Sequence, residues 1–459
     1  MAKKIDMLTG SIWDKMVLFA LPLALTGMLQ QLFNAADVAV LGRYVSNEAM
    51  AAVGSNVPVI GLIINLCMGL ALGANVVVAR ALGMKDHERA HNAVHTALLT
   101  AIVFGTFMTL VGELFTGTIL SYLAVPDSVI GHAEAYLRVF LLGMPFIALY
   151  NFLAAIFRSQ GDTQTPLWAL VAATIFNIAG NFFAVMVLDM EAGGVAAATV
   201  GANVLAAGIL FVRLAYIDDP LRLNIRHLLA VDARELRSIV RIGWPAGLQG
   251  AVFSISNLII QAAINSLGPE VMAGSVAAFT VEINVYCFIN AFALAATTFV
   301  SQNYGAGNIE RCRRVMWVSL GLNFVATISM TILIFLFCRP LLGLFTDSEA
   351  VIELAIIRMI WVLSPQFIQV IMDTVSGAMR GYGYSLPPAL MTLASICTVR
   401  IVWVWTVFEM YPNYEVLMAV YPVSWIVAAI GLSWLYWYHQ TRILPKKLNN
   451  SSLKREGFF

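Results

Sequence analysis

Four carboxylates of this sequence lie within long apolar stretches: Asp37, Glu113, Glu282 and Asp373. A charged side chain in an apolar, lipid-like surrounding is costly, so each carboxylate kept there is a candidate for binding an ion or a substrate. Glu113 lies near the end of its stretch, where its side chain can reach water. Asp37, Glu282 and Asp373 are therefore the stronger candidates for binding an ion or a substrate.

Polar side chains precede Asp37 at helical spacing. Gln30, Asn34 and Asp37 stand at positions i, i+4 and i+7, so we expect them to share one face of a helix. Such a face must lie against protein or water rather than lipid. Removal from water favours the protonated form of a carboxyl, which makes Asp37 a candidate proton carrier; with neutral oxygen ligands it could instead hold Na⁺. A buried carboxyl that only joins helices is the structural alternative.

Further polar groups interrupt other apolar stretches. Asn177 and Asn181 are one helical turn apart, although such pairs can also serve only to join helices. In the second half, Glu282 and Asp373 would attract a cationic substrate in a region of low dielectric constant. The alternative is that either pairs with an arginine inside the membrane, for which Arg400 is the candidate.

Composition identifies the elements that must position these residues. Of the 459 residues, 60% are hydrophobic and 12% are charged, whereas about 25% of a typical soluble domain is charged. The sequence therefore predicts an integral membrane protein and excludes secreted, nucleic-acid-binding and disordered classes. The five cysteines form no C-x-x-C pair, and no nucleotide loop or hydrolase motif is present. We expect no enzyme activity, no cofactor and no structural metal.

Twelve apolar segments are long enough to cross a bilayer as helices. Their expected limits are 15–42, 54–81, 92–116, 132–158, 165–188, 193–217, 238–266, 273–303, 312–338, 353–380, 385–409 and 416–440. The longest polar connection divides them into two sets of six. We therefore predict an all-α membrane protein with an N-lobe at 1–217, a linker at 218–237, a C-lobe at 238–445 and a tail at 446–459.

Charge predicts the orientation. Most of the 27 Lys and Arg residues fall at the N-terminus, in the even-numbered connections and in the C-terminal tail. Because positive charge marks the cytoplasmic side, we expect both termini in the cytoplasm of a cell whose inner membrane holds the protein.

The two halves repeat each other. Pro22 in the first apolar segment corresponds to Pro245 in the seventh, and Arg158 corresponds to Arg380. Each half has an even number of expected spans, so both enter the membrane from the same side. They should be related by a pseudo-twofold axis along the membrane normal, an arrangement associated with alternating access.

One motif resembles a known family. The stretch Phe299-Val-Ser-Gln-Asn-Tyr-Gly-Ala-Gly-Asn-Ile-Glu-Arg311 is similar to the signature that follows helix 8 of MATE transporters, the multidrug and toxic compound extrusion family of the MOP superfamily. Arg158-Ser-Gln-Gly-Asp-Thr163 is similar to that family's loop after helix 4. Pro22 matches its bent first helix and would act as the hinge.

The resemblance implies a cation site in the N-lobe. The matching side chains are Asp37, Asn177, Asn181 and Thr199, with Tyr136 and Gln30 nearby. In the DinF-like branch position 181 can be Asp, so Asn181 leaves Asp37 to titrate alone. The glutamate of the NorM-like branch aligns with Phe253, which favours the DinF-like branch and leaves a C-lobe site only through Asp373.

The resemblance also implies a function. We expect an antiporter, coupled to H⁺ or Na⁺, that exports amphipathic, mostly cationic small molecules by alternating access. Gln30, Asn34, Glu282 and Asp373 are the expected substrate-binding residues. We expect it to act as a monomer in the bilayer. The alternative is a flippase for lipids or lipid-linked oligosaccharides with the same fold.

Overall fold

The computed structural model of the chain describes residues 4–123, 125–217, 221–224 and 231–452. Regular secondary structure in these residues is helical. Ten helices are long and apolar enough to cross a membrane, and there are twelve spans when each of two bent helix pairs counts as one. The predicted all-α, multi-pass fold class is therefore confirmed. Parts of the expected linker (218–220 and 225–230) and of the tail (453–459) lie outside the described residues.

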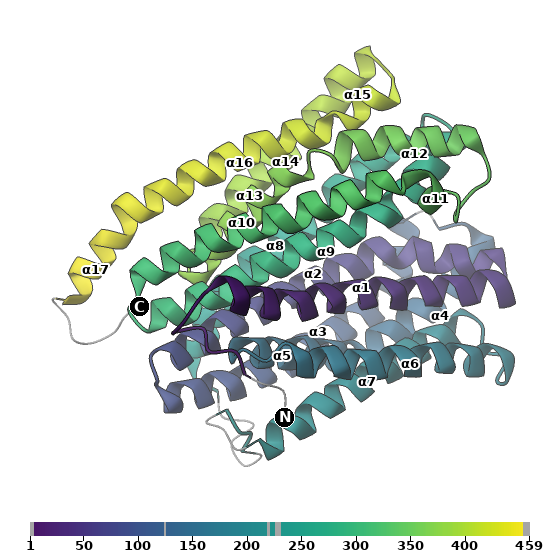
Figure 1. Ribbon diagram of the computed structural model, residues 1–459. Coiled ribbons are helices and arrows are strands. Elements are labelled where there is room, and N and C mark those ends of the chain that lie inside the picture. The colour runs from purple at the N-terminus through teal and green to yellow at the C-terminus, as the bar shows by residue number, and fades with distance from the viewer. Residues whose placement is uncertain (1–3, 124, 218–220, 225–230, 453–459) are drawn as a thin grey trace. The chain divides into compact units, whose positions relative to one another are not determined.

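The described residues form two compact units, of which the first comprises Met1–Ile255 and Thr297–Val315. It contains seven complete helices: α1 (Trp13–Tyr44), α2 (Asn47–Gly83), α3 (His87–Tyr122), α4 (Asp127–Leu142), α5 (Met144–Ser159), α6 (Gln164–Met186) and α7 (Ala192–Tyr216). In Figure 1, α6 lies beside both α1 and α7. These three helices carry most of the expected cation site.

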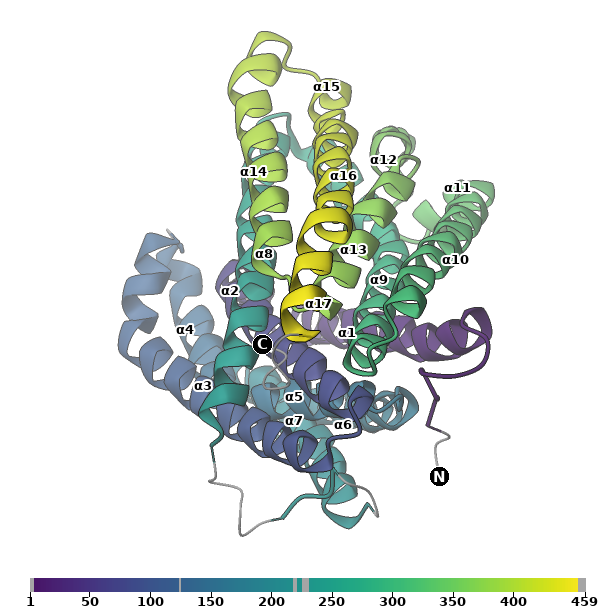
Figure 2. The same cartoon turned by 90° about the vertical axis from the view of Figure 1, so that its left-hand side faces the viewer.

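The second unit comprises Ser256–Ala296 and Met316–Phe459. Its described helices are α11 (Cys338–Leu342), α12 (Glu349–Val362), α13 (Gln366–Gly381), α14 (Leu386–Trp403), α15 (Tyr414–Met418), α16 (Val420–Tyr438) and α17 (Leu444–Ser452). A π-helical turn follows α14 at Val404–Phe408, and another follows α16 at His439–Ile443. Figure 2 shows α14 and α16 side by side.

Three helices have residues in both units. They are α8 (Ala233–Asn265), α9 (Pro269–Gly305) and α10 (Ile309–Leu336). The end of α9 and the start of α10, which contain the Gln302-Asn303 motif, belong to the first unit.

Two of the expected spans, at 132–158 and 353–380, are bent helix pairs rather than single helices. The axes of α4 and α5 differ by 50°, and those of α12 and α13 differ by 45°. A proline stands at each break: Pro145 in the first turn of α5, and Pro365 just before α13. Proline lacks an amide donor and clashes with the preceding turn, so a helix ends before it and a new helix can begin at it.

The core of the first unit is built largely from small and branched apolar side chains. Val76 of α2, Ala97 of α3 and Phe152 of α5 are fully buried in one continuous cluster. In α2, α3 and α5 the buried alanines allow close helix approach, the usual basis of helix packing in lipid, where no hydrophobic effect drives helices together.

Gly83 permits a direct backbone contact between α2 and α9. A Cβ atom at Gly83 would lie 2.0 Å from the carbonyl oxygen of Gln302. The Gln302 side chain donates a 2.6 Å hydrogen bond to the carbonyl oxygen of Ser159. The family-like motif therefore ties the ends of α2, α5 and α9 together.

The same motif holds the segment that precedes α1. Asn303 donates to the carbonyl oxygen of Met7 at 3.0 Å. The guanidinium of Arg311 donates to the carbonyl oxygens of Thr9 and Gly10 at 3.0 and 2.9 Å. Met7 is buried. These contacts give the polar motif a structural role that its sequence alone did not reveal.

We predict that Gly83→Ala lowers the apparent melting temperature of the purified protein. The added methyl group would overlap a backbone oxygen, an overpacking strain that costs about 1–3 kcal/mol. Gly54→Ala in the same helix is the matched control, because a Cβ there meets no atom within 4 Å. The control should melt at the wild-type temperature or slightly above it. Equal melting of the two variants would contradict the close contact.

Candidate ion-binding site

Three polar side chains from two helices converge on the carboxylate of Asp37, which lies on α1 in the first unit. Asn177 and Asn181 of α6 donate to Oδ1 of Asp37 at 3.0 and 2.7 Å. The hydroxyl of Thr199 on α7 donates to Oδ2 at 2.7 Å. The structure thus brings together the four side chains that the family resemblance named.

Small residues set the approach of α6 to α7. A Cβ atom at Gly180 would lie 3.1 Å from the Cβ of Ala198, so the two helices are in contact where they carry Asn181 and Thr199. On α6 the two asparagines are one turn apart and therefore face the same way.

Asp37 is buried with neutral partners only. It is 2% exposed, and Asn177 and Asn181 are fully buried. No ion pair with Asp37 occurs within the described part of the chain. A carboxylate away from water is costly unless it is paired, so this site favours the uptake of a proton or a small cation.

One acceptor beside the carboxylate is unsatisfied. Oδ1 of Asn181 is buried and has no hydrogen-bond partner among the described residues. Such an atom calls for a donor or a cation, because a buried polar group without a partner costs free energy.

The partners of Asp37 can serve either ion. An asparagine amide presents both an oxygen and an NH₂ group, and a threonine hydroxyl both donates and accepts. With Asp37 ionised, the amide NH₂ groups and the hydroxyl donate to it. With a cation bound, the amide and hydroxyl oxygens become ligands of the kind that hard cations prefer. No cluster of three or more His, Cys, Asp or Glu side chains suited to a metal occurs in the described residues.

Tyr136 of α4 lies near this cluster. Its side chain is 5% exposed, and the Asp37 carboxylate is close enough to act on it electrostatically. Its ring stacks on that of Phe140 with a centroid distance of 6.3 Å.

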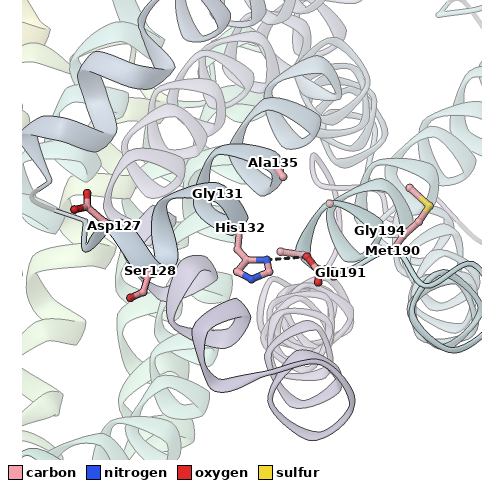
Figure 3. A pocket seen from close by; sticks show the side chains of 10 residues that line it. Asp127, Ser128, Gly131, His132, Ala135, Met190, Glu191 and Gly194 are labelled. Atoms are coloured by element: carbon pink, nitrogen blue, oxygen red, sulfur yellow. Dashed lines mark ion pairs between the residues drawn. The ribbon is translucent and has the colours of Figure 1, made fainter.

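An ion pair joins α4 to the start of α7. Nδ1 of His132 lies 3.1 Å from a carboxylate oxygen of Glu191, and Figure 3 shows the two side chains pointing toward each other. They line a cavity of about 480 Å³. His132 precedes Tyr136 by one turn and Glu191 precedes Thr199 by about two, so the pair links the two elements that carry Tyr136 and Thr199. The sequence reasoning missed this pair, whose only signal was a histidine in the first turns of α4.

The predicted polar face on α1 is only partly buried. Asn34 is exposed and Gln30 is half-buried, whereas Asp37 is buried. No hydrogen bond links Gln30 or Asn34 to Asp37 in the part of the chain that the structure describes. Gln30 and Asn34 thus lie outside the hydrogen-bond network of Asp37, and their role in substrate binding stays a prediction.

Pro22 lies inside α1, which continues through it. The hydroxyl of Thr26 donates to the carbonyl oxygen of Pro22 at 2.7 Å. Because proline cannot donate to the preceding turn, the helix has one backbone hydrogen bond fewer at this point. The hinge role of Pro22 stays a prediction.

Glu282 forms a buried ion pair in the second unit. Nε of Arg358 lies 3.0 Å from one carboxylate oxygen of Glu282, and Nη2 lies 3.1 Å from the other. The alternative partner, Arg400, instead donates to Asn257 at 2.6 Å, so that assignment was wrong. Arg358 lies nine residues after the start of α12. Its contact with Glu282 on α9 depends on how these helices pack, which the sequence alone does not give. Pairing leaves Glu282 with little net charge for a cationic substrate.

Asp373 retains more of its expected character. It lies on α13, half-buried, and it has a hydrogen bond with Gln369. Arg380, two turns along the same helix, is near enough to act on it electrostatically. Its Oδ2 atom is buried without a hydrogen-bond partner among the described residues. Glu113 pairs with Arg138 at 2.8 Å.

The apolar helices define a multi-pass membrane protein, and its buried carboxylate without a charged partner is a candidate ion-binding site of the kind found in secondary transporters. The profile of the MatE family matches residues 22–183 and 245–406. The chain belongs to this family. The two matched stretches fall in the two halves, in agreement with the internal repeat.

Relatives resemble the chain in sequence, and a solved structure resembles it in fold. The chain is 28% identical to "Probable multidrug resistance protein YoeA" of Bacillus subtilis over 94% of each chain. It is 28% identical to "Probable multidrug resistance protein NorM" of Thermotoga maritima over 85% of this chain and 84% of that one. A multidrug resistance MATE family transporter of the MOP superfamily, solved in an outward-facing conformation, has the same fold, with a TM-score of 0.87, 22% identity and coverage of 95% and 97%.

We predict that Thr199→Val lowers the free energy of unfolding by about 1–3 kcal/mol, because one oxygen of Asp37 loses its donor. Thr199→Ser keeps the hydroxyl and is the matched control. The two variants are compared by thermal unfolding in detergent. Equal unfolding temperatures would show that the 2.7 Å contact does not stabilise the carboxylate.

We also predict that Arg358→Met destabilises the protein by about 3–5 kcal/mol, since it leaves the Glu282 carboxylate buried and unpaired. The double variant Arg358→Met with Glu282→Leu should recover most of the loss. Thermal unfolding of the wild type, the two single variants Arg358→Met and Glu282→Leu, and the double variant measures the coupling. Additive losses in the double variant would mean that the two side chains do not depend on each other.

Proposed function

We propose that this protein is an antiporter that exports amphipathic, mostly cationic small molecules in exchange for H⁺ or Na⁺. The observation that carries the proposal is the Asp37 carboxylate, buried among neutral donors, with the unsatisfied oxygen of Asn181 beside it. That arrangement favours reversible binding of one positive charge. The substrate class is supported by the names of the relatives, two of which are called probable multidrug resistance proteins.

In the proposed mechanism, binding of the coupling ion on the outside causes the protein to release its substrate there. A proton or Na⁺ entering from outside binds Asp37, and the hydrogen bonds of Asn177, Asn181 and Thr199 reorganise around it. Because Asn181 and Thr199 lie on α6 and α7, a change in their hydrogen bonds alters how α1 packs against both helices. Pro22 lets α1 respond at its weakest backbone position, and the expected result is release of substrate to the outside.

Coupling to H⁺ and coupling to Na⁺ place different demands on the atoms that face Asp37. Proton coupling needs only one carboxyl and one acceptor. Sodium coupling needs several oxygens at once, which Asn177, Asn181 and Thr199 can supply after their amides turn.

We further propose the lobe division 1–217 and 238–445, with both termini in the cytoplasm, a location in the inner membrane and action as a monomer. The separate family matches at 22–183 and 245–406 support the division. The distribution of Lys and Arg supports the orientation.

The flippase alternative receives less support. Binding a pyrophosphate inside the membrane would require available cationic side chains. Arg358 is paired with Glu282, so this buried arginine is not available to a phosphate ligand, and Arg400 is the only other arginine that is buried among the described residues.

The test is efflux of a fluorescent lipophilic cation from reconstituted vesicles, with a proton gradient or a sodium gradient imposed separately. We expect transport by the wild type under one of the two gradients, which identifies the ion. Asp37→Asn should abolish this transport, because the amide cannot take up either ion while it preserves the shape of the side chain.

Glu113→Gln is the matched control, since it removes another carboxylate from an apolar stretch outside the Asp37 cluster. It should transport at the wild-type rate. Wild-type transport by Asp37→Asn would overturn the coupling role of Asp37. Translocation of a lipid-linked sugar, with no cation efflux under either gradient, would favour the flippase instead.

A further inference from the structure

A groove runs between the outer faces of α6 and α7, away from the Asp37 cluster along the same helices. It encloses about 740 Å³. Its lining comes from the first turns of α6, chiefly Gln164 and Trp168, and from the last turns of α7, chiefly Gly208, Ile209 and Arg213. Because the two helices are neighbours that run in opposite directions, these segments lie side by side.

The groove is polar at one end and apolar at the other. Gln164 begins α6 and Arg213 lies in the last turn of α7, so both stand at the end nearest the membrane surface. Trp168, Gly208 and Ile209 lie about one turn deeper, roughly 5–6 Å along the helix axis. A membrane lipid has the same order of parts, with a polar headgroup at the surface and an apolar acyl chain below it.

The polar end carries available positive charge. Arg213 is exposed, and it makes no ion pair with any residue that the structure describes. Arg222 donates to the carbonyl oxygen of Ala215 at 3.2 Å, which brings a second guanidinium to the end of α7. The nearest acid at the start of α6, Asp162, is buried and accepts hydrogen bonds from the amides of Gln164 and Thr165.

The apolar end has open space and an interfacial anchor. A Cβ atom at Gly208 would meet nothing within 4 Å. Trp168 is 67% exposed. Exposed tryptophan at this depth is typical of the lipid headgroup region.

We propose that this groove binds one anionic glycerophospholipid. The phosphate lies against Arg213, and one acyl chain lies along Trp168, Gly208 and Ile209. A zwitterionic lipid fits the apolar part equally well but gains less at the arginine, because its headgroup carries no net negative charge. The proposal is independent of the transport function proposed above, since it concerns the membrane-facing side of α6 and α7.

The test uses the full-length protein in bilayers that contain brominated lipid, which quenches tryptophan fluorescence on contact. Brominated phosphatidylglycerol is the anionic probe and brominated phosphatidylcholine is the zwitterionic one. The signal of Trp168 is the difference between the wild type and Trp168→Phe. We expect phosphatidylglycerol to bind at this position about threefold to fivefold more strongly than phosphatidylcholine.

Two variants test the two ends of the groove. Arg213→Gln should abolish the preference while leaving quenching by both lipids. Gly208→Leu should fill the apolar part and reduce quenching by both. Arg241→Gln removes an exposed arginine from α8, away from the groove residues, and should keep the wild-type preference.

Equal quenching of wild-type Trp168 by the two lipids would overturn the proposal. So would a preference that Arg213→Gln leaves unchanged, or one that Arg241→Gln removes to the same extent, since either result would indicate only a general attraction of anionic lipid to a positive surface. Gly208→Leu keeps the test decisive if Arg213→Gln fails to fold, because unchanged quenching in that variant would show that no lipid chain occupies the groove.

Discussion

The burial of Asp37 without a positive side chain is the constraint on which the arrangement of the first unit depends. A carboxylate that is 2% exposed cannot rely on water, so each of its oxygens needs a donor from the protein. Two come from α6 and one from α7, and all three are neutral. Neutral donors reduce the cost of the charge but do not cancel it. The site is therefore stable enough to form and still favours a proton or cation.

Glu282 illustrates the other way to bury a carboxylate. Arg358 contacts both of its oxygens, and the same guanidinium donates to Ser275 at 2.8 Å. Such a pair is satisfied without any ligand, and breaking it would leave two buried charges. A transporter gains from one site that exchanges ions and from another that holds helices in place. Under the proposed antiport, Asp37 with its neutral partners would exchange the ion, and Glu282 with its charged partner would hold helices in place.

Sequence reasoning reached the fold because the solvent is lipid. Helices must satisfy their own backbone and must be about 20 residues long, so apolar length alone predicted the spans. It could not predict the breaks near Pro145 and Pro365, since proline inside an apolar stretch fits either a kink or a helix end. Asn177 was noticed through its spacing from Asn181, whereas Thr199 was assigned only through the family resemblance, because a lone threonine in an apolar stretch is not unusual.

Other contacts join residues that are far apart in the sequence, and local sequence patterns cannot predict such contacts. Arg358 meets Glu282 across 76 residues, and Arg311 meets the carbonyl oxygen of Gly10 across 301. Helical periodicity gives the face of a side chain only relative to its own helix. Which neighbouring helix that face meets is set by tertiary packing, so periodicity alone could not tell that Asp37 is buried whereas Asn34 is exposed.

The internal repeat shows how duplicated positions acquired different chemistry. Arg158 and Arg380 correspond to each other, and the residue seven positions earlier is Asn151 in the first half but Asp373 in the second. Asn151 donates to the backbone of its own helix at 2.8 Å, whereas Asp373 retains a buried oxygen without a hydrogen-bond partner among the described residues. Arg138 and Arg358 also correspond to each other in the repeat. Arg138 is exposed and pairs with Glu113, whereas Arg358 is buried and pairs with Glu282. A repeat that preserves helix lengths, prolines and arginines can therefore keep one architecture while each half changes where its carboxylates lie. Because a carboxylate at membrane depth must be either satisfied or functional, those few substitutions determine where each half keeps a paired carboxylate and where it keeps a candidate ion-binding one.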